Sequence, residues 1–197
     1  MNKKLFSLAL LSTFSIPALA VEDSGIYLVG MAGNTSNISS VDSSTSLGGM
    51  VGFKFSSFFA VEGGMTLLAD KANYQVAQTP VIIAGTSYTY TSTTMAGSEF
   101  AAVFGLPLGD DFSVLFRLGY ASLERSNNPS PPEVEVQWKG ATMGLAAQYM
   151  LPYDFAFGQN KMSIGFRAGV TRYNLTDVTG LLKETPTNSY VAGVIQF

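Results

Sequence analysis

The sequence offers few side chains that could do chemistry. Its 197 residues include 11 Lys and Arg, 14 Asp and Glu, and neither His nor Cys. Without Cys and His there is no disulfide framework and no zinc site built from those ligands. Without His there is also no imidazole base, so the Ser-rich stretch 36–46 has no histidine to activate a nucleophile. We therefore predict a protein that is not an enzyme and that holds no cofactor or metal.

The remaining chemistry lies in five charged residues at mid-segment positions among small residues. Lys54, Arg117 and Arg167 are cations, and Glu62 and Glu99 are anions. An unpaired buried charge costs several kcal/mol, so we predict a network in which both glutamates bridge between the cations. Gln148 and Gln196 add amide groups to the same face. The network is interpreted either as a structural polar plug or as a gate. A carboxylate pair for acid–base catalysis is disfavoured because the intervening cations would hold both groups ionised.

These charges sit in segments that alternate with the two-residue period of β-strands. Eight such segments are predicted over residues 25–33, 46–56, 59–69, 94–106, 112–123, 139–151, 162–173 and 188–197. Short connections at 56–58, 107–111 and 152–161 alternate with long ones at 34–45, 70–93, 124–138 and 174–187. Short turns at one end and long loops at the other are typical of an up-and-down transmembrane barrel.

The two faces of each segment differ in a way that indicates which face meets lipid. In segment 46–56, Leu47, Val51 and Phe53 alternate with small residues such as Gly48 and Gly52. Large apolar side chains suit lipid, and small ones suit the narrow lumen of an eight-stranded barrel. The sequence thus predicts an all-β fold, an eight-stranded antiparallel up-and-down transmembrane β-barrel. The aromatic residues near the short connections would form an interfacial girdle; they are Phe55, Phe59, Phe112, Tyr149 and Phe197.

The first twenty residues have the pattern of a cleaved signal peptide. Lys3 and Lys4 precede an apolar run that ends near Ile16, and residues 17–20 (Pro-Ala-Leu-Ala) supply small residues at the cleavage site. The apolar run is shorter than the roughly 20 residues that a membrane-spanning helix needs. We predict that residues 1–20 are removed and that residues 21–197 form the barrel domain.

The final segment alternates to a C-terminal aromatic residue. Ile195 and Phe197 share one face with Val191 and Gly193, and we interpret Ile195 and Phe197 as a C-terminal assembly signal. Together with residues 48–55 (GGMVGFKF) and 60–64 (AVEGG), this pattern resembles the OmpA-like eight-stranded outer-membrane barrel family, which includes OmpX/Ail-type and opacity-type surface proteins.

The resemblance implies a bacterial outer-membrane location, with membrane lipid, lipopolysaccharide and the barrel assembly machinery as partners. It also implies, as an analogy, the charge-pair gate proposed for OmpA barrels. Barrel enzymes of this membrane mostly rely on a catalytic His, which this sequence lacks. OmpA proteins continue into a peptidoglycan-binding domain, and no residue follows Phe197 here, so we do not expect cell-wall tethering.

The long connections are the other candidates for binding. Tyr88, Tyr90 and Trp138 are candidate contacts for a host or surface ligand, and the alternative is that they are ordinary loop residues. The alternation continues over residues 86–91 and 133–136, so we expect these two connections to project beyond the membrane as arms. A formal net charge of −3 gives no basic surface for nucleic acid, and we expect a monomer.

Cations close to the predicted outer leaflet suggest a further contact. Arg125, Arg172 and Lys183 could meet lipopolysaccharide phosphates or be solvated loop charges. The predicted function is that of a non-enzymatic outer-membrane protein with a structural or surface-interaction (adhesion or resistance) role carried by its loops. The alternative is a narrow pore for small solutes or apolar ligands.

Overall fold

The computed structural model of the chain describes residues 24–39, 41, 43–73, 81–83, 86–88, 91–128, 136–157 and 160–197. Its eight long strands are β1 (Gly25–Ser36), β2 (Ser44–Ser56), β3 (Phe59–Asn73), β6 (Ser92–Pro107), β7 (Phe112–Asn128), β8 (Val136–Phe157), β9 (Asn160–Asp177) and β11 (Thr187–Gln196). The short strands are β4 (Val81–Ile83), β5 (Thr86–Tyr88) and β10 (Lys183–Glu184). No helix among the described residues has the length and apolar character needed to cross a membrane. The signal peptide predicted over residues 1–20 lies outside the described residues.

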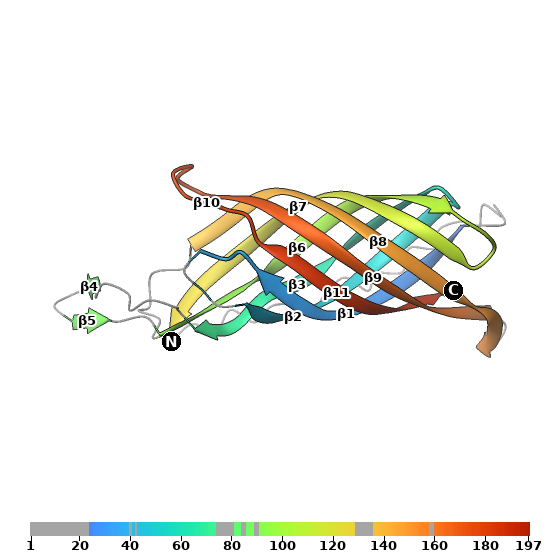
Figure 1. Cartoon of the computed structure of the whole chain (residues 1–197), viewed down its shortest axis with the longest axis horizontal. Coiled ribbons are helices and arrows are strands. Elements are labelled where there is room, and N and C mark those ends of the chain that lie inside the picture. Colours follow the sequence, from blue (N-terminus) through green and yellow to red (C-terminus); the bar gives the residue numbers. More distant parts are fainter. Residues whose placement is uncertain are drawn as a thin grey trace.

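The long strands close into a barrel (Figure 1). Neighbours pair antiparallel in the order β9-β11-β1-β2-β3-β6-β7-β8, and β8 pairs with β9 to complete the circle. The first and last strands are joined by the β1–β11 ladder, in which Tyr27 is opposite Gln196 and Ser36 is opposite Thr187. The Phe197 N–H extends this seam by donating to the Ile26 carbonyl oxygen at 2.9 Å. The predicted fold class, an eight-stranded antiparallel barrel, is confirmed.

Side-chain burial follows the sequence alternation. Along β1, Tyr27 and Val29 are buried in the lumen, whereas Ile26 and Leu28 are exposed on the outside. The other strands alternate in the same way, and their exposed outer faces carry large apolar side chains such as Leu145 and Phe166. Exposed apolar side chains of this size, in a closed barrel without strand edges, are what a lipid environment favours.

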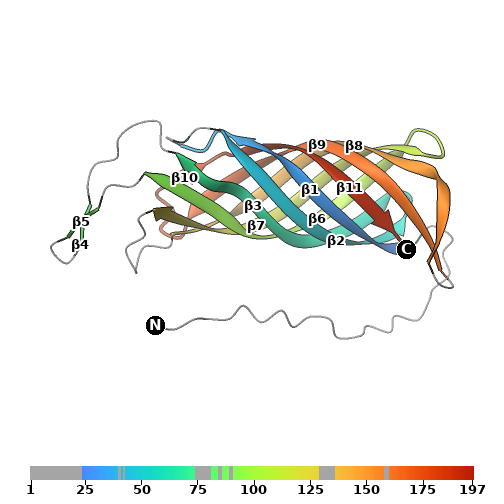
Figure 2. The same cartoon turned by 90° about the horizontal axis from the view of Figure 1, so that it is seen from below.

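The two ends of the barrel differ. The tight turns after β2, β6 and β8 and the C-terminus lie at one end, here called the short-turn end (Figures 1 and 2). β10 lies at the opposite, long-loop end, and pairs with β9. β4 and β5 form a separate two-stranded sheet beyond the long-loop end, away from the barrel wall (Figure 2).

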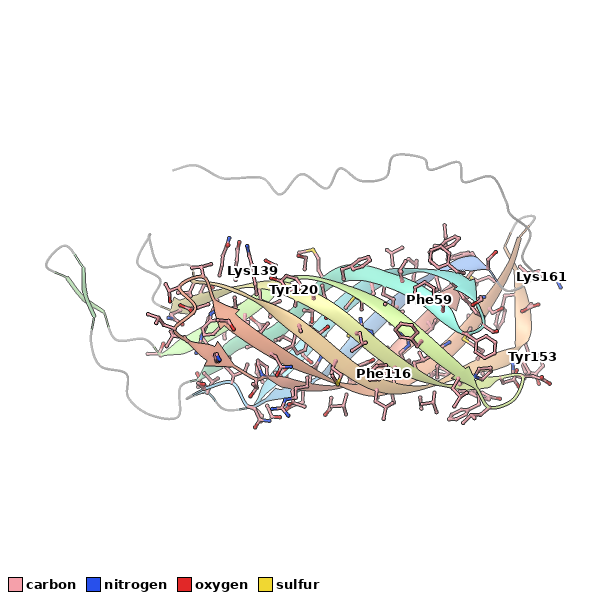
Figure 3. All side chains as sticks on the ribbon, turned by 90° about the horizontal axis from the view of Figure 1, so that it is seen from above. Phe59, Phe116, Tyr120, Lys139, Tyr153 and Lys161 are labelled. Carbon is pink, nitrogen blue, oxygen red and sulfur yellow. The ribbon has the colours of Figure 1, made fainter. Side chains whose placement is uncertain are left out.

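Aromatic side chains ring the outer wall near the short-turn end. The rings of Phe55 and Phe59 stack with centroids 5.6 Å apart, and Phe59 lies 5.5 Å from Phe104. Figure 3 shows Phe116 on the outside of the ribbon, between Lys139 toward the long-loop end and Lys161 at the short-turn end. The apolar wall is thus bounded by charged side chains at both ends, as expected for a band that spans a bilayer.

Several strands are longer than predicted. The connection predicted at 152–161 is mostly strand, because β8 continues to Phe157 and β9 begins at Asn160. The register shifts between Met150 and Asp154, and Pro152 lies within this irregular stretch. Proline lacks the N–H that a regular ladder needs, so a bulge accommodates it. β3 also carries register shifts between Leu67 and Ala69 and between Ala69 and Ala72.

Candidate functional site in the barrel lumen

Four of the charged residues singled out in the sequence meet near the middle of the lumen. Glu62 on β3, Glu99 on β6, Arg117 on β7 and Arg167 on β9 are each at most 4% exposed. Glu62, Glu99 and Arg167 are each flanked along their strand by Gly or Ala on the lumen face, and Arg117 lies between Leu115 and Gly119. The curvature of the barrel brings the four side chains together. We refer to these four residues as the ion cluster.

Glu62 is the centre of the ion cluster. Its Oε2 accepts a hydrogen bond from Arg117 Nε at 2.9 Å, and its Oε1 accepts one from Arg167 Nη1 at 2.6 Å. The Tyr27 hydroxyl donates to the same Oε1 at 2.9 Å. Three donors therefore surround one carboxylate, and charge-assisted hydrogen bonds of this kind are about twice as strong as neutral ones.

Glu99 contacts only one of the two arginines. Its Oε1 lies 3.3 Å from Arg117 Nη1, and the Tyr173 hydroxyl donates to its Oε2 at 2.9 Å. The Thr142 hydroxyl donates to Glu99 Oε1 at 3.3 Å. Arg117 rather than Glu99 is thus the second bridging group, since it contacts both carboxylates. The prediction that both glutamates bridge between cations is corrected accordingly.

Gln148 fixes the second arginine. Its Oε1 accepts from Arg167 Nε at 3.1 Å and from Arg167 Nη2 at 2.9 Å. The guanidinium of Arg167 also lies 5.8 Å from the centroid of the Tyr27 ring, within range of a cation–π contact. The predicted residues Glu62, Glu99, Arg117, Arg167 and Gln148 are therefore brought together by the fold.

The hydroxyl donors Tyr27 and Tyr173 were not singled out from the sequence. In the predicted segments 25–33 and 162–173, the two-residue alternation places both tyrosines on the lumen face. That alternation is the sequence signal that could have identified them. In the ion cluster two carboxylates are matched by two guanidinium groups, so the buried charge is balanced. Balanced and hydrogen-bonded charges are the form in which ions are tolerated in a low-dielectric interior.

Lys54 does not belong to the ion cluster. Its side chain is half-buried near the short-turn end, where it lines a cavity of about 240 Å³ with Asp110, Asp111 and Gln196. Among the residues that the structure describes, no ion pair involves Lys54. The prediction that Lys54 joins the network is wrong, because its position two residues before the end of β2 leaves it close to water at the barrel mouth.

A second, apolar cluster fills the lumen between the ion cluster and the long-loop end. Leu68, Met95, Leu123, Trp138 and Leu175 are all at most 3% exposed within it. Ile38 and Val41, from the segment between β1 and β2, pack into the same cluster. We refer to this group as the apolar plug.

Trp138 was predicted as a loop contact for a partner, and the structure corrects this. It lies on β8, paired with Leu123 of β7 and Asp177 of β9, and its indole points into the lumen at 3% exposure. The long connection was predicted to run through residue 138, but β8 already begins at Val136. Trp138 is therefore a strand residue that packs in the apolar plug.

A buried ion pair closes the long-loop end above the apolar plug. Arg125 on β7 pairs with Glu184 on β10, and Glu184 Oε2 also accepts from the backbone N–H of Ser39 at 3.4 Å. Burial raises the pKa of Glu184 above its ordinary value of 4.5, because desolvation outweighs the attraction of Arg125. Arg125 faces the lumen, so the interpretation that it contacts lipid phosphates is wrong. Arg172 and Lys183 are exposed on the outside.

The other predicted site residues lie at the barrel ends. Ile195 is half-buried and Phe197 is 44% exposed, both on the outer wall at the short-turn end. Their role as an assembly signal stays a prediction. The backbone of Tyr88 lies in β5, and Tyr90 falls outside the described residues.

The fold is similar to that of a solved bacterial surface protein. The solved structure of Neisserial surface protein A (NspA) has a TM-score of 0.54 at 12% identity, covering 87% of this chain and 96% of that chain. OprG from Pseudomonas aeruginosa has a TM-score of 0.43 at 13% identity, covering 89% of this chain and 97% of that chain. No curated protein is significantly similar in sequence. The family model of the outer membrane protein beta-barrel domain matches residues 6–194. The chain therefore belongs to the outer membrane protein beta-barrel domain family, and it lies in the bacterial outer membrane.

Proposed function

We propose that this protein is a non-enzymatic, closed outer-membrane barrel whose role is structural or surface-interacting and is carried by its loops. In barrels of this membrane short turns face the periplasm and long loops face the exterior. The long-loop end is accordingly the extracellular end. The observation that carries the proposal is that side chains fill the lumen at two successive levels, the ion cluster and the apolar plug.

The two levels oppose a permanently open path through the lumen, because opening one costs free energy at each level. An eight-stranded barrel has a lumen just wide enough for side chains to fill. A solute crossing it would have to separate Arg117 or Arg167 from Glu62, and breaking a buried ion pair costs about 3–5 kcal/mol. It would also have to displace Leu68, Leu123 and Trp138, which are buried together in the apolar plug.

The extracellular end offers the surface for a partner. β3, β6, β7 and β8 extend beyond their predicted limits toward this end, and β4 and β5 add a separate hairpin there. Strands that extend from a rigid barrel are suited to binding a partner, because their backbone is already ordered before the partner arrives. We infer that residues 74–92 and 126–136 carry contacts to a host or other surface ligand.

The surface role is tested by removing these loops separately from a barrel that still folds. Loss of binding to cells or matrix by the 74–92 or the 126–136 deletion, with heat-modifiable gel migration retained, supports it. Shortening the turn at 178–182 serves as a matched control at the same end. Full binding by both loop deletions would contradict the loop assignment.

A narrow, gated pore is the second candidate, and one observation favours it. Arg117 contacts Glu62 through Nε and Glu99 through Nη1, and its Nη2 has no hydrogen-bond partner among the described residues. An arginine between two carboxylates could shift toward one of them. Planar-bilayer recordings of wild type, Glu62→Ala and Arg117→Ala separate the candidates. Negligible conductance in all three rejects the gate, and conductance in wild type rejects the closed barrel.

A further inference from the structure

The lipid-facing wall contains a strip without side chains. Gly30 on β1 is in register with Gly193 on β11 and with Gly49 on β2. No heavy atom lies within 4 Å of the position that a Cβ would occupy at any of the three. In the next row, Ala32 on β1 continues the strip with a small side chain, and Ala168 on β9 lies in the same row on the far side of Val191. We call Gly30, Gly49, Gly193 and Ala32 the glycine furrow.

Large apolar side chains stand on both sides of the glycine furrow. Met65 and Phe166 flank the glycine row, and Leu47 and Val191 flank Ala32. All four are more than half exposed, at 51–65%. Together with the furrow they line the central part of a shallow hollow of about 1100 Å³, which also runs around the outer wall to Ala96 on β6 and to Tyr149 and Phe112 on β8 and β7. The outer wall is therefore hollowed here.

The groove continues toward the extracellular end and becomes polar. A second hollow shares Ala32, Ala168 and Val191 with the first and runs on to Asn34 and Ser189. In the following row Thr187 is in register with Arg172. Arg172 is exposed on the outer wall, and no ion pair among the described residues involves it. An apolar groove thus leads to a cluster of hydrogen-bond donors and one positive charge.

The length of this path matches one leaflet of a membrane. From Gly30 to Ser36 the strand advances six residues, or about 20 Å at roughly 3.3 Å per residue. With strands tilted by about 40°, this is a rise of about 15 Å along the bilayer normal. The hydrocarbon core is about 30 Å thick, so the groove reaches from near its middle to one interface. Since the polar residues lie toward the long loops, that interface is the outer one.

We propose that the glycine furrow binds an acyl chain of a phosphorylated lipid of the outer leaflet, with Arg172 at its phosphate. A chain without branches fits a groove whose floor is backbone, and the guanidinium pairs with phosphate through two parallel N–H donors. A second copy of the barrel could cover the apolar part but would leave Arg172 unused. The charge at the end of the groove therefore favours a lipid. This inference rests on the membrane location and is independent of whether the lumen conducts.

The test measures binding of bisphosphorylated, hexa-acylated lipid A to the purified barrel by native mass spectrometry. Gly30→Leu fills the furrow, and the open space around that position allows the substitution without a clash. Gly63→Leu is its matched control, because Gly63 lies on the outer wall between Val51 and Phe100, outside the groove. Arg172→Gln removes the charge, with Lys71→Gln on the opposite side of the barrel as control. We expect about tenfold weaker binding, equivalent to about 1.4 kcal/mol, for Gly30→Leu and for Arg172→Gln. The two controls should bind like wild type, and heat-modifiable migration reports that each variant is folded.

Two further experiments distinguish a phosphorylated lipid in the groove from a second copy of the barrel. With dephosphorylated lipid A, Arg172→Gln should bind like wild type while Gly30→Leu still binds weakly. Undiminished binding of lipid A by Gly30→Leu, or an equal loss with Gly63→Leu, would overturn the proposal. Because the chain has no cysteine of its own, Gly49→Cys tests for a second copy. A disulfide-linked dimer formed efficiently in membranes would replace the lipid with a barrel–barrel interface, and its absence supports the lipid.

Discussion

Glu62 is the carboxylate of the ion cluster that contacts both arginines. Both of its oxygens accept from arginine, and the Tyr27 hydroxyl shares one of them. Removing this charge leaves Arg167 without a carboxylate and leaves Arg117 with Glu99 alone. The arginines stabilise the buried carboxylate of Glu62, and the carboxylate in turn compensates their buried positive charge.

We predict that Glu62→Gln lowers the free energy of unfolding by about 3–5 kcal/mol, the cost of leaving a buried charge without its partner. The measurement is a denaturant titration of the barrel in lipid vesicles. Glu124→Gln, on the exposed face of β7, is the matched control and should change the value by less than about 0.5 kcal/mol. An equally small effect of Glu62→Gln would mean that the arginines find other partners.

At the scale of a strand, the two-residue alternation of β3 decides which leucine faces the lumen. Leu67 faces outward, whereas Leu68 is fully buried in the apolar plug. Lipid is as apolar as leucine, so truncating Leu67 exposes little that was protected. We predict that Leu68→Ala costs about 2–5 kcal/mol of unfolding free energy and Leu67→Ala much less. Comparable losses from the two substitutions, measured by the same titration, would place both leucines on one face.

The attachment of β10 should depend on pH. Because the pKa of Glu184 is raised in the folded barrel, the docked strand binds more protons than the undocked one at pH values just above 4.5. Docking of β10 onto the barrel is therefore most favourable at low pH. It becomes less favourable as the pH rises from 4.5 through the raised pKa of Glu184. Hydrogen exchange of the 178–186 segment, corrected for intrinsic rates, should show more protection near about pH 5 than near about pH 7.5.

Glu184→Gln is the control for this pH dependence, since it keeps the shape and removes the titration. Its corrected protection should be the same at both pH values. Greater protection of wild type at the higher pH would mean that the Arg125 pair outweighs desolvation.

The strands and the ion cluster were predictable because both depend on a two-residue period. The period assigns Glu62, Glu99, Arg117 and Arg167 to the lumen without knowledge of neighbours. It fails where the ladder is irregular: Leu68 follows the alternation of Glu62 and Thr66 into the lumen, but no sequence signal marks the register shift that buries its neighbour Ala69 as well. The pairing of Glu184 with Arg125 depends on β10 folding back onto β9, a contact between distant segments that local patterning does not encode. Lys54 was misjudged because parity states which face a side chain occupies but not how close water comes.

At the scale of the whole molecule, the outer wall is an apolar band bounded by charges. Substituting Leu145, which is 60% exposed near the middle of the band, should therefore be costly. We predict that Leu145→Arg lowers the unfolding free energy by about 2–4 kcal/mol in vesicles, as for a cation near the bilayer midplane. Leu181→Arg, at an 84% exposed position of the turn before β10, should have almost no effect. Equal tolerance of both would contradict a lipid-facing wall.

The seam between β1 and β11 has a consequence for how the protein reaches this state. Every other ladder between long strands joins two that follow one another along the chain, with only the short β4, β5 or β10 between them, whereas this one joins the first and last described strands. Until β11 is in place, β1 and β9 each present an edge whose amide groups have no partner, and hydrocarbon offers none. Insertion and closure are thus coupled, and the long-range pairing makes closure the slow step of folding. A partly assembled barrel has to be sheltered from lipid until its last strand arrives.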